Sequence, residues 1–226
     1  MSEPEEKAPD PGRAAALAAL RRDYAGRPLL ESDAGGDPLA LFGRWLDEAI
    51  AAGVELANAM VIATAAPDGQ PSARVVLLKS WGPDGFVFYT DLGSRKAQEL
   101  AANPAAALLF YWEPLHRQVR VEGRAAPVSA AESDAYFATR PRASNLSAIA
   151  SAQSQVVASR GALEEAAARA AQTWHGRELE RPARWGGIRV APHRFEFWQG
   201  REDRLHDRLC YRASPPEGWT RERLYP

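Results

Sequence analysis

The chain has 226 residues, of which 46% are hydrophobic and 25% are charged, a balance typical of a globular protein with a sizeable core. Its formal net charge of -1 argues against a general nucleic-acid binder, so any anion site must be a local cluster of cations. The single cysteine, Cys210, excludes an internal disulfide framework, and no apolar run approaches the ~18 residues that a membrane span needs.

The N-terminal segment 1–12 is acidic and rich in proline, and it lacks the basic and apolar parts of a secretory signal. We therefore expect a disordered tail over 1–12, one domain over 13–226 and a cytoplasmic location. An alanine- and leucine-rich run over 13–23 predicts a short helix that ends near Arg21 and Tyr24.

The pair Asp37-Pro38 predicts the N-cap and first residue of a second helix. Apolar residues recur along that helix at the spacing of one packing face: Leu41, Phe42, Trp45, Leu46 and Ile50. Strands are expected next at 59–66, 72–81 and 86–90, and the short turns between them favour an antiparallel meander.

Ser94 is expected to cap a helix that ends near Asn103, followed by strands at 107–112 and 117–128. Ser129 and Glu132 form an S-x-x-E capping box for the next helix. Helical propensity continues at 144–150 and 160–173, and strands return at 185–190, 194–200, 204–212 and 219–224. The pattern predicts a mainly β fold with flanking helices (α+β), built on an antiparallel sheet that curls into a barrel.

Arg95 and Lys96 lie at a helix start, where each cation is unfavourable by up to ~1 kcal/mol unless an anion binds there. Solvated surface charge is the alternative. Arg74 and Lys79 differ by an odd number, so in a regular strand they project from opposite faces and imply two anions, or one anion and one ion pair.

Two further clusters carry candidate site residues. Tyr136, Arg140, Arg142 and Ser144 suit a bound phosphate, although an arginine complementing a helix dipole is the alternative. Near Trp198, the residues Arg204, His206 and Arg208 alternate onto one strand face, which should line a cleft or an interface. Together the clusters suggest a phosphorylated cofactor that meets a phosphorylated substrate, whereas the four scattered histidines make a multi-histidine metal site unlikely.

The sequence resembles the pyridoxamine 5'-phosphate oxidase family, from about Arg21 to the C-terminus. The matches run in family order: RVVLLK, FYT, LGSRKA, RQVRVEG, YFATRPR, AQS, WGGIRV and FWQGREDRLHDR. The resemblance implies a split β-barrel of the antiparallel Greek-key type and a homodimer with two FMN molecules at the subunit interface. It also implies oxidation of pyridoxine 5'-phosphate and pyridoxamine 5'-phosphate to pyridoxal 5'-phosphate by dioxygen, which gives hydrogen peroxide, in vitamin B6 biosynthesis and salvage.

The resemblance also assigns roles to residues. Its FMN set is Arg74, Val75, Val76, Leu77, Leu78, Lys79, Tyr89, Thr90, Arg95, Lys96, Gln118, Gln153, Ser154, Trp198 and Arg208. Within this set, the resemblance assigns the FMN phosphate to Arg95 and Lys96, helped by Arg74, Gln153 and Ser154. Its substrate set is Arg21, Tyr24, Lys79, Tyr136, Arg140, Ser144, Arg204, Leu205 and His206, with Arg204 and His206 as the catalytic pair. The chain departs from the family pattern at 145–147, where Asn-Leu-Ser replaces a glutamine, an apolar residue and a glycine.

Two alternatives remain open at this stage. One is a related split-barrel flavin oxidase that acts on another small aromatic substrate, such as a phenazine precursor. The other is a non-catalytic protein that binds FMN or pyridoxal phosphate. Neither a nucleic-acid partner nor a membrane is expected.

Overall fold

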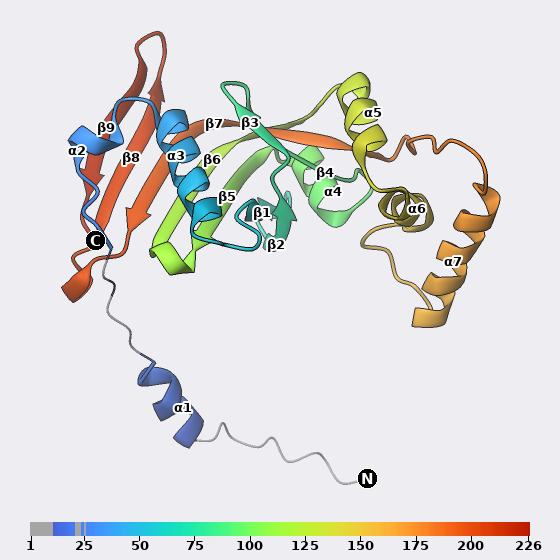
Figure 1. The fold of residues 1–226 in the computed structure, drawn as a ribbon, viewed down its shortest axis with the longest axis horizontal. Coiled ribbons are helices and arrows are strands. Elements are labelled where there is room, and N and C mark those ends of the chain that lie inside the picture. Colours follow the sequence, from blue (N-terminus) through green and yellow to red (C-terminus); the bar gives the residue numbers. More distant parts are fainter. Residues whose placement is uncertain (1–10, 21–23, 25) are drawn as a thin grey trace.

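The computed structural model describes residues 11–20, 24 and 26–226, and a nine-stranded antiparallel sheet forms the centre of this part of the chain (Figure 1). The strands are β1 (Ala59–Ala65), β2 (Pro71–Leu77), β3 (Ser80–Gly82), β4 (Gly85–Asp91), β5 (Ala105–Trp112), β6 (Arg117–Pro127), β7 (Trp185–Gln199), β8 (Asp207–Ser214) and β9 (Gly218–Leu224). The helices are α1 (Pro11–Ala18), α2 (Glu31–Ala34), α3 (Pro38–Ala51), α4 (Arg95–Ala102), α5 (Ala130–Thr139), α6 (Arg142–Ala150) and α7 (Arg160–Thr173), with short 3-10 turns η1 (Glu113–Leu115) and η2 (Glu202–Arg204).

The strand order is β2-β1-β5-β6-β7-β4-β3, and β8 and β9 extend the sheet from the second half of β7. Because β4 returns beside β7 rather than beside β5, these four strands have the Greek-key order. The hydrogen-bonded path runs from β2 to β3 and, within the described strands, does not join these two, so the curled sheet stays split there.

Strand β7 is a single element of 15 residues, although the sequence predicted two strands on either side of Pro192. The strand passes through the proline because the register against β6 shifts there: Gly123 faces Pro192 whereas Glu122 faces Arg194. His193 is the extra residue of this bulge, and a bulge is where a strand tolerates proline. One long strand therefore connects β4 at its start with β8 at its end.

The strand predicted over 72–81 is instead broken into β2 and β3, and the predicted meander is wrong at this point. Leu78 turns into the core, where it is 5% exposed, and its backbone pairs with Asn58 outside the β1–β2 ladder. After this break β3 pairs with β4, and β4 pairs with β7 rather than with β2. Because of this break, Lys79 does not follow the alternation of side chains that one continuous strand over 72–81 would give.

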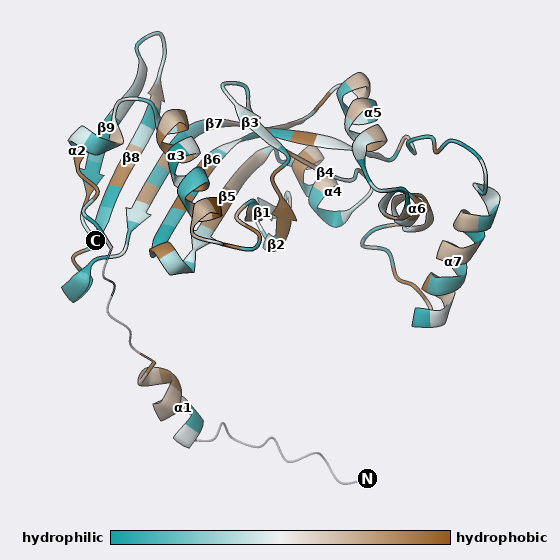
Figure 2. Cartoon of the chain, in the orientation of Figure 1, coloured by the Kyte–Doolittle hydropathy of each residue, from teal (hydrophilic) through white to brown (hydrophobic). Residues whose placement is uncertain are grey.

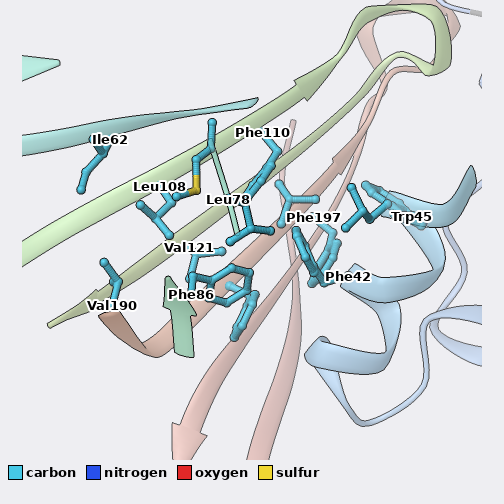
Figure 3. Close-up of a cluster of buried hydrophobic side chains, with 14 of the residues drawn as sticks. Phe42, Trp45, Ile62, Leu78, Phe86, Leu108, Phe110, Val121, Val190 and Phe197 are labelled. Atoms are coloured by element: carbon cyan, nitrogen blue, oxygen red, sulfur yellow. The ribbon is translucent and has the colours of Figure 1, made fainter. Parts of the chain in front are cut away.

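Helix α3 packs against the sheet and contributes Phe42 and Trp45 to the aromatic core (Figure 3). It begins as predicted, with the Asp37 carboxylate accepting a hydrogen bond from the Leu39 backbone N–H at 2.9 Å. Phe42 is fully buried against the rings of Trp81, Phe86, Phe110 and Trp112. The prediction for Ile50 is wrong, because its side chain is 60% exposed and Ala49 occupies the buried position instead.

The N-terminal predictions fall partly outside the described residues. Helix α1 begins at Pro11 and ends at Ala18, earlier than the run over 13–23 suggested, and Arg21 is not described. Most of the predicted tail over 1–12 is likewise undescribed.

Hydrophobic residues are concentrated in the central strands and on the inner face of α3, whereas β8 and β9 carry many hydrophilic residues (Figure 2). No helix in the described part of the chain is long and apolar enough to cross a bilayer.

Phe42→Ala should lower the free energy of unfolding by about 3–5 kcal/mol, because it removes a fully buried ring and leaves a cavity. Urea unfolding followed by circular dichroism measures this loss. Ile50→Ala on the same helix is the matched control and should stay within about 0.5 kcal/mol of the unsubstituted protein. Equal losses for the two variants would contradict the orientation of α3.

Candidate active site

An open cavity of about 790 Å³ lies between β2, β4, the start of β7 and helices α4 to α6. Predicted cofactor residues and predicted substrate residues meet in its lining. They are Arg74, Val75, Val76, Leu77, Lys79, Tyr89, Thr90, Lys96, Tyr136, Arg140, Ser144 and Gln153. The cavity therefore joins two cation groups, one around Lys96 and one around Arg140.

Arg74 and Lys79 both line this cavity, which corrects the expectation that they lie on opposite faces of one strand. The expectation failed because β2 ends at Leu77 and the chain turns before β3 begins at Ser80. The side chain of Leu78 points instead into the core and does not line the cavity. Two cations can thus face one ligand region from one segment of the chain.

Lys96 is the most deeply buried cation of the site, with 8% of its surface exposed. Its Nζ donates to Gln153 Oε1 at 2.7 Å, to Thr90 Oγ1 at 3.0 Å and to Ser94 Oγ at 3.3 Å. No carboxylate in the described part of the chain forms an ion pair with it. Burial, and next the positive charge of Arg74, lower the pKa of Lys96, so the bare site disfavours the charge that it holds.

Ser94 occupies the N-cap position of α4, as predicted, but its hydroxyl does not cap the helix. The side chain is fully buried and lies beside Lys96 Nζ instead. The first-turn amide groups of α4 consequently have no side-chain acceptor at this N-cap. A helix N-terminus with free amides beside a buried lysine is a favourable place for an anion.

Arg95 lies outside the cavity lining, although it was predicted beside Lys96 as a phosphate ligand. Its side chain is 59% exposed, and its Nε donates to Glu99 Oε1 at 2.8 Å. Ser154 also lies outside the lining and is exposed, in a left-handed conformation with φ 73°. Of the predicted phosphate ligands, the cavity itself holds Arg74, Lys96 and Gln153.

A stack of aromatic rings forms one wall of the cavity. Tyr89 and Tyr136 are stacked with centroids 3.9 Å apart, and Tyr89 lies 5.4 Å from Trp185 with nearly parallel rings. Gly187 allows this arrangement, because a Cβ there would lie 2.8 Å from the Tyr89 ring. Burial raises the pKa of Tyr89, which keeps its hydroxyl neutral.

Arg140 lies above this wall with its guanidinium carbon 4.5 Å from the Trp185 ring centroid. It is the C-cap residue of α5 with an extended backbone, and it lines the same cavity as Tyr136. Its Nη1 donates to Asn145 Oδ1 at 3.0 Å and its Nη2 to the Ser144 carbonyl at 3.3 Å. Burial lowers the pKa of Arg140, and no described carboxylate pairs with it.

Asn145 is one of the positions where the chain departs from the family pattern. It is 5% exposed, accepts from Arg140 and donates from Nδ2 to the Phe137 carbonyl at 2.9 Å. The replacement therefore fixes the Arg140 guanidinium instead of disturbing the site. Neither Asn145 nor Trp185 was assigned a role from the sequence, although Trp185 opens the WGGIRV motif.

A second group of predicted residues gathers around Trp198 at the far end of β7. Gln118 of β6 and Arg208 of β8 lie directly opposite Trp198 on its two neighbouring strands. The Tyr24 ring packs against Trp198, His116 and His206 with centroids 5.0 to 5.5 Å away. Arg208 is held by Glu196, which is 4% exposed and accepts from its Nε at 2.9 Å.

The predicted alternation of Arg204, His206 and Arg208 on one strand face is wrong, because β8 begins only at Asp207. Arg204 belongs to the turn η2, has a φ of 60° and is exposed, as is Leu205. His206 packs at 4.8 Å from the Trp198 ring. The three residues still belong to one region, but a tight turn brings them together rather than a strand.

His206 has a defined protonation state. The Arg201 backbone N–H donates to His206 Nδ1 at 3.1 Å, so Nδ1 is the acceptor and the proton of the neutral ring lies on Nε2. Burial, followed by the charge of Arg204, lowers the pKa of His206 below its ordinary value of 6.5. At neutral pH the residue therefore offers a hydrogen-bond donor at Nε2.

The two groups lie at opposite ends of β7 in the same chain. Trp185 begins the strand and Trp198 lies near its end, which corresponds to about 40 Å along the strand at 3.3 Å per residue. A ligand that fills the cavity cannot also reach Trp198 and His206 of the same chain over that distance. Contact with both groups requires a second copy.

The fold and the cavity define a class: an antiparallel barrel protein with a pocket lined by cations and stacked aromatic rings. Residues 46–174 match the family model described as "Pyridoxamine 5'-phosphate oxidase". Residues 185–226 match the "Pyridoxine 5'-phosphate oxidase C-terminal dimerisation region". The chain belongs to the pyridoxamine 5'-phosphate oxidase family.

Curated relatives named pyridoxine/pyridoxamine 5'-phosphate oxidase match nearly the whole chain. The protein of Rubrobacter xylanophilus is 58% identical over 93% of this chain and 96% of its own length. That of Nocardioides sp. is 54% identical over 93% and 98%. Among solved structures, PhzG from Burkholderia lata, in complex with tetrahydrophenazine-1-carboxylic acid, has a TM-score of 0.83 at 34% identity and covers 89% of this chain and 100% of PhzG.

We expect His206 to carry its proton on Nε2 at pH 7, because its Nδ1 is already occupied as an acceptor. Long-range ¹H–¹⁵N correlation spectra distinguish the two tautomers, and His206→Gln assigns the signal. The same pattern should persist from pH 8 to about pH 6.5, since the pKa lies below its ordinary value. A doubly protonated ring at pH 7 would contradict this geometry.

Proposed function

We propose that this chain is an FMN-dependent oxidase that converts pyridoxamine 5'-phosphate and pyridoxine 5'-phosphate to pyridoxal 5'-phosphate. The observation that carries the proposal is one cavity with two cation groups, Lys96 and Arg140, each held by neutral oxygen atoms. No described carboxylate pairs with either cation, and two such cations in a cavity with an aromatic wall suit two phosphorylated ring compounds. The names of relatives that match 93% of the chain support the same activity.

The group around Lys96 fits the phosphate of FMN. Lys96, Thr90 and Ser94, together with the first-turn amides of α4, would hold the phosphate, and Arg74 adds a second cation at the cavity. Gln153 would orient Lys96, since its Oε1 accepts from Nζ at 2.7 Å. The half-exposed strand β2 would provide the backbone and apolar side chains that face the ring system.

The group around Arg140 fits the phosphate of the substrate. Arg140 is pre-oriented by Asn145 and Trp185, and it shares the cavity with Tyr136, Ser144 and Lys79. These side chains supply charged and neutral donors of the kind that a phosphate monoester requires. The nearby rings of Tyr89 and Tyr136 would exclude water from one side of the site.

A homodimer completes the site in this proposal. The family match described as a dimerisation region covers β7, β8 and β9, which carry Trp198, Arg204, His206 and Arg208. Because these residues lie about 40 Å along β7 from the cavity of their own chain, they would serve the cavity of the partner. Gln118, Leu205 and Tyr24 belong to the same contributed group.

Bound FMN would accept two electrons from the substrate carbon and pass them to dioxygen, which yields hydrogen peroxide. Overall, pyridoxine 5'-phosphate and dioxygen give the aldehyde and peroxide, whereas the amine substrate also consumes water and releases ammonia. In this proposal His206 donates from Nε2 to orient the substrate, and Arg204 lies two residues away in the η2 turn. Arg208, fixed by Glu196, holds positive charge beside Trp198.

The second candidate is an oxidase of phenazine precursors, which the similarity to PhzG favours. The identity to PhzG is 34%, against 58% to the Rubrobacter oxidase. The cavity also contains the complete set of substrate-phosphate residues, Lys79, Tyr136, Arg140 and Ser144. A carrier without catalysis would not need Arg204 and His206 near the partner's cavity, so the oxidase is preferred over both alternatives.

We also propose that residues 13–226 form one FMN-binding split-barrel domain that works in the cytoplasm. The continuous sheet from β1 to β9 supports a single domain. Cys210 is buried and makes no disulfide, which is compatible with a reducing compartment.

The purified protein should be yellow and should consume dioxygen when pyridoxine 5'-phosphate or pyridoxamine 5'-phosphate is added.

Arg204→Ala should lower kcat by at least about tenfold while FMN stays bound, because Arg204 is assigned to the substrate and not to the cofactor. Oxygen uptake and the flavin absorbance measure the two properties. Arg212→Ala on the exposed part of β8 is the control and should retain full turnover. Full turnover by Arg204→Ala would remove that residue from the site.

Arg140→Met should raise KM for phosphorylated substrates by about 10- to 100-fold, the equivalent of 1.5–3 kcal/mol for a charge-assisted hydrogen bond. Pyridoxine without its phosphate should be affected little, since it lacks the group that Arg140 binds. Arg142→Met is the matched control, because Arg142 donates to the carbonyls of Arg177 and Trp174 outside the cavity. A similar KM increase with both substrates would favour the phenazine-type alternative.

A further inference from the structure

Glu99 is a buried carboxylate of α4 that lies behind the Lys96 group and was not assigned a role from the sequence. It is 6% exposed. Its Oε2 accepts from Thr64 Oγ1 at 2.5 Å and from Ser72 Oγ at 2.6 Å, and lies 3.3 Å from Arg74 Nη2. Its Oε1 accepts from Arg95 Nε at 2.8 Å. One carboxylate thus connects strands β1 and β2 with both arginines that flank Lys96.

The same contacts organise Arg74. Its Nη1 donates to Thr64 Oγ1 at 2.6 Å and its Nη2 donates to Ser72 Oγ, so the guanidinium is held by the two hydroxyls that also bind Glu99. An arginine side chain otherwise loses rotamer entropy when a ligand fixes it. In this arrangement that cost is met when the protein folds, before any ligand binds.

We infer that Glu99 is a positioning residue that fixes Arg74 beside the phosphate pocket of Lys96 and thereby sets the affinity for the phosphate of FMN. The inference rests on the proposed function, because it names FMN as the ligand. Glu99 itself does not line the cavity, so it acts through Arg74, which does.

The charges of this cluster agree with the inference. Arg74, Arg95 and Lys96 carry three positive charges, and Glu99 neutralises one of them. The remaining two match the 1.5–2 negative charges of a phosphate monoester at neutral pH. Asp91 at the cavity edge is already paired with Arg184, with Arg184 Nε 3.0 Å from Asp91 Oδ2.

Glu99 stays ionised throughout the useful pH range. The hydrogen bonds from Ser72 and Thr64, aided by Arg95, lower its pKa from 4.5 to about 2. A folded-state pKa below the unfolded value means that the stabilisation is present above about pH 4.5 and is lost as the pH falls toward 2. Glu99→Gln therefore removes a charge that is always present under assay conditions and keeps the shape of the side chain.

The test is a fluorescence titration of the flavin-free protein with FMN and, separately, with riboflavin, which lacks the phosphate. For Glu99→Gln we expect the Kd for FMN to rise at least tenfold and the Kd for riboflavin to stay within about twofold. A role confined to general stability would change both flavins alike. Far-UV circular dichroism of the flavin-free variant checks that the fold is retained.

Glu31→Gln is the matched control. Glu31 is another carboxylate whose pKa is lowered to about 2, in this case by Arg223, and it joins α2 to β9 away from the cavity. This variant should bind both flavins like the unsubstituted protein. Ser72→Ala provides a second probe if Glu99→Gln does not fold, because it removes one hydroxyl that holds both Glu99 and Arg74, and it should weaken FMN alone by about three- to tenfold.

Unchanged or tighter FMN binding by Glu99→Gln would overturn the inference, since the carboxylate would then be neutral or would compete with the phosphate for the arginines. If Glu99→Gln does not fold, unchanged FMN binding by Ser72→Ala overturns it in the same way. If the unsubstituted protein fails to bind FMN at all, the proposed function itself fails. The two failures are thus separable in one set of titrations.

Discussion

The burial of Lys96 among neutral oxygen atoms is the constraint on which the site depends. Its Nζ contacts Gln153, Thr90 and Ser94, and the described part of the chain gives it no carboxylate partner. A buried charge without a counter-charge is costly, and such a charge persists in folded proteins where a ligand or a reaction needs it. The arrangement of α4 follows from this requirement, because the Ser94 hydroxyl is turned away from capping and the helix N-terminus is left available for an anion.

Strand β7 separates the residues around the cavity from the residues around Trp198. At its start it carries Trp185, which supports Arg140, and near its end it carries Trp198 between Gln118 and Arg208. A strand of 15 residues is too long for one ligand to contact both ends. The same strand that builds the core of one subunit therefore separates the two groups of residues, and in the proposed function a homodimer would bring one group of a subunit to the cavity of its partner. Two buried carboxylates hold arginines of these groups: Glu99 pairs with Arg74, which lines the cavity, and Glu196 pairs with Arg208 beside Trp198.

Sequence reasoning recovered the elements and the residue types better than the geometry that unites them. Short motifs located Lys96, Arg140 and Tyr136, and the cavity brings all three together. Periodicity failed where the backbone leaves a regular path: the break at Leu78 placed Arg74 and Lys79 on one cavity, and the bulge at Pro192 joined two predicted strands into β7. Arg95 shows a different limit, because its i,i+4 pairing with Glu99 within α4 could have been read from the helical spacing and was missed.

The most direct test of the central claim is the urea unfolding of the flavin-free protein and its Lys96→Met variant, each with and without FMN. If Lys96 is an uncompensated cation kept for an anion, Lys96→Met should be at least as stable as the unsubstituted protein without ligand. Added FMN should then raise the free energy of unfolding of the unsubstituted protein strongly, by about 2.7 kcal/mol at 100 times its Kd, and should raise that of the variant much less at the same concentration. A variant that is destabilised without ligand and still gains the full stabilisation from FMN would contradict the account.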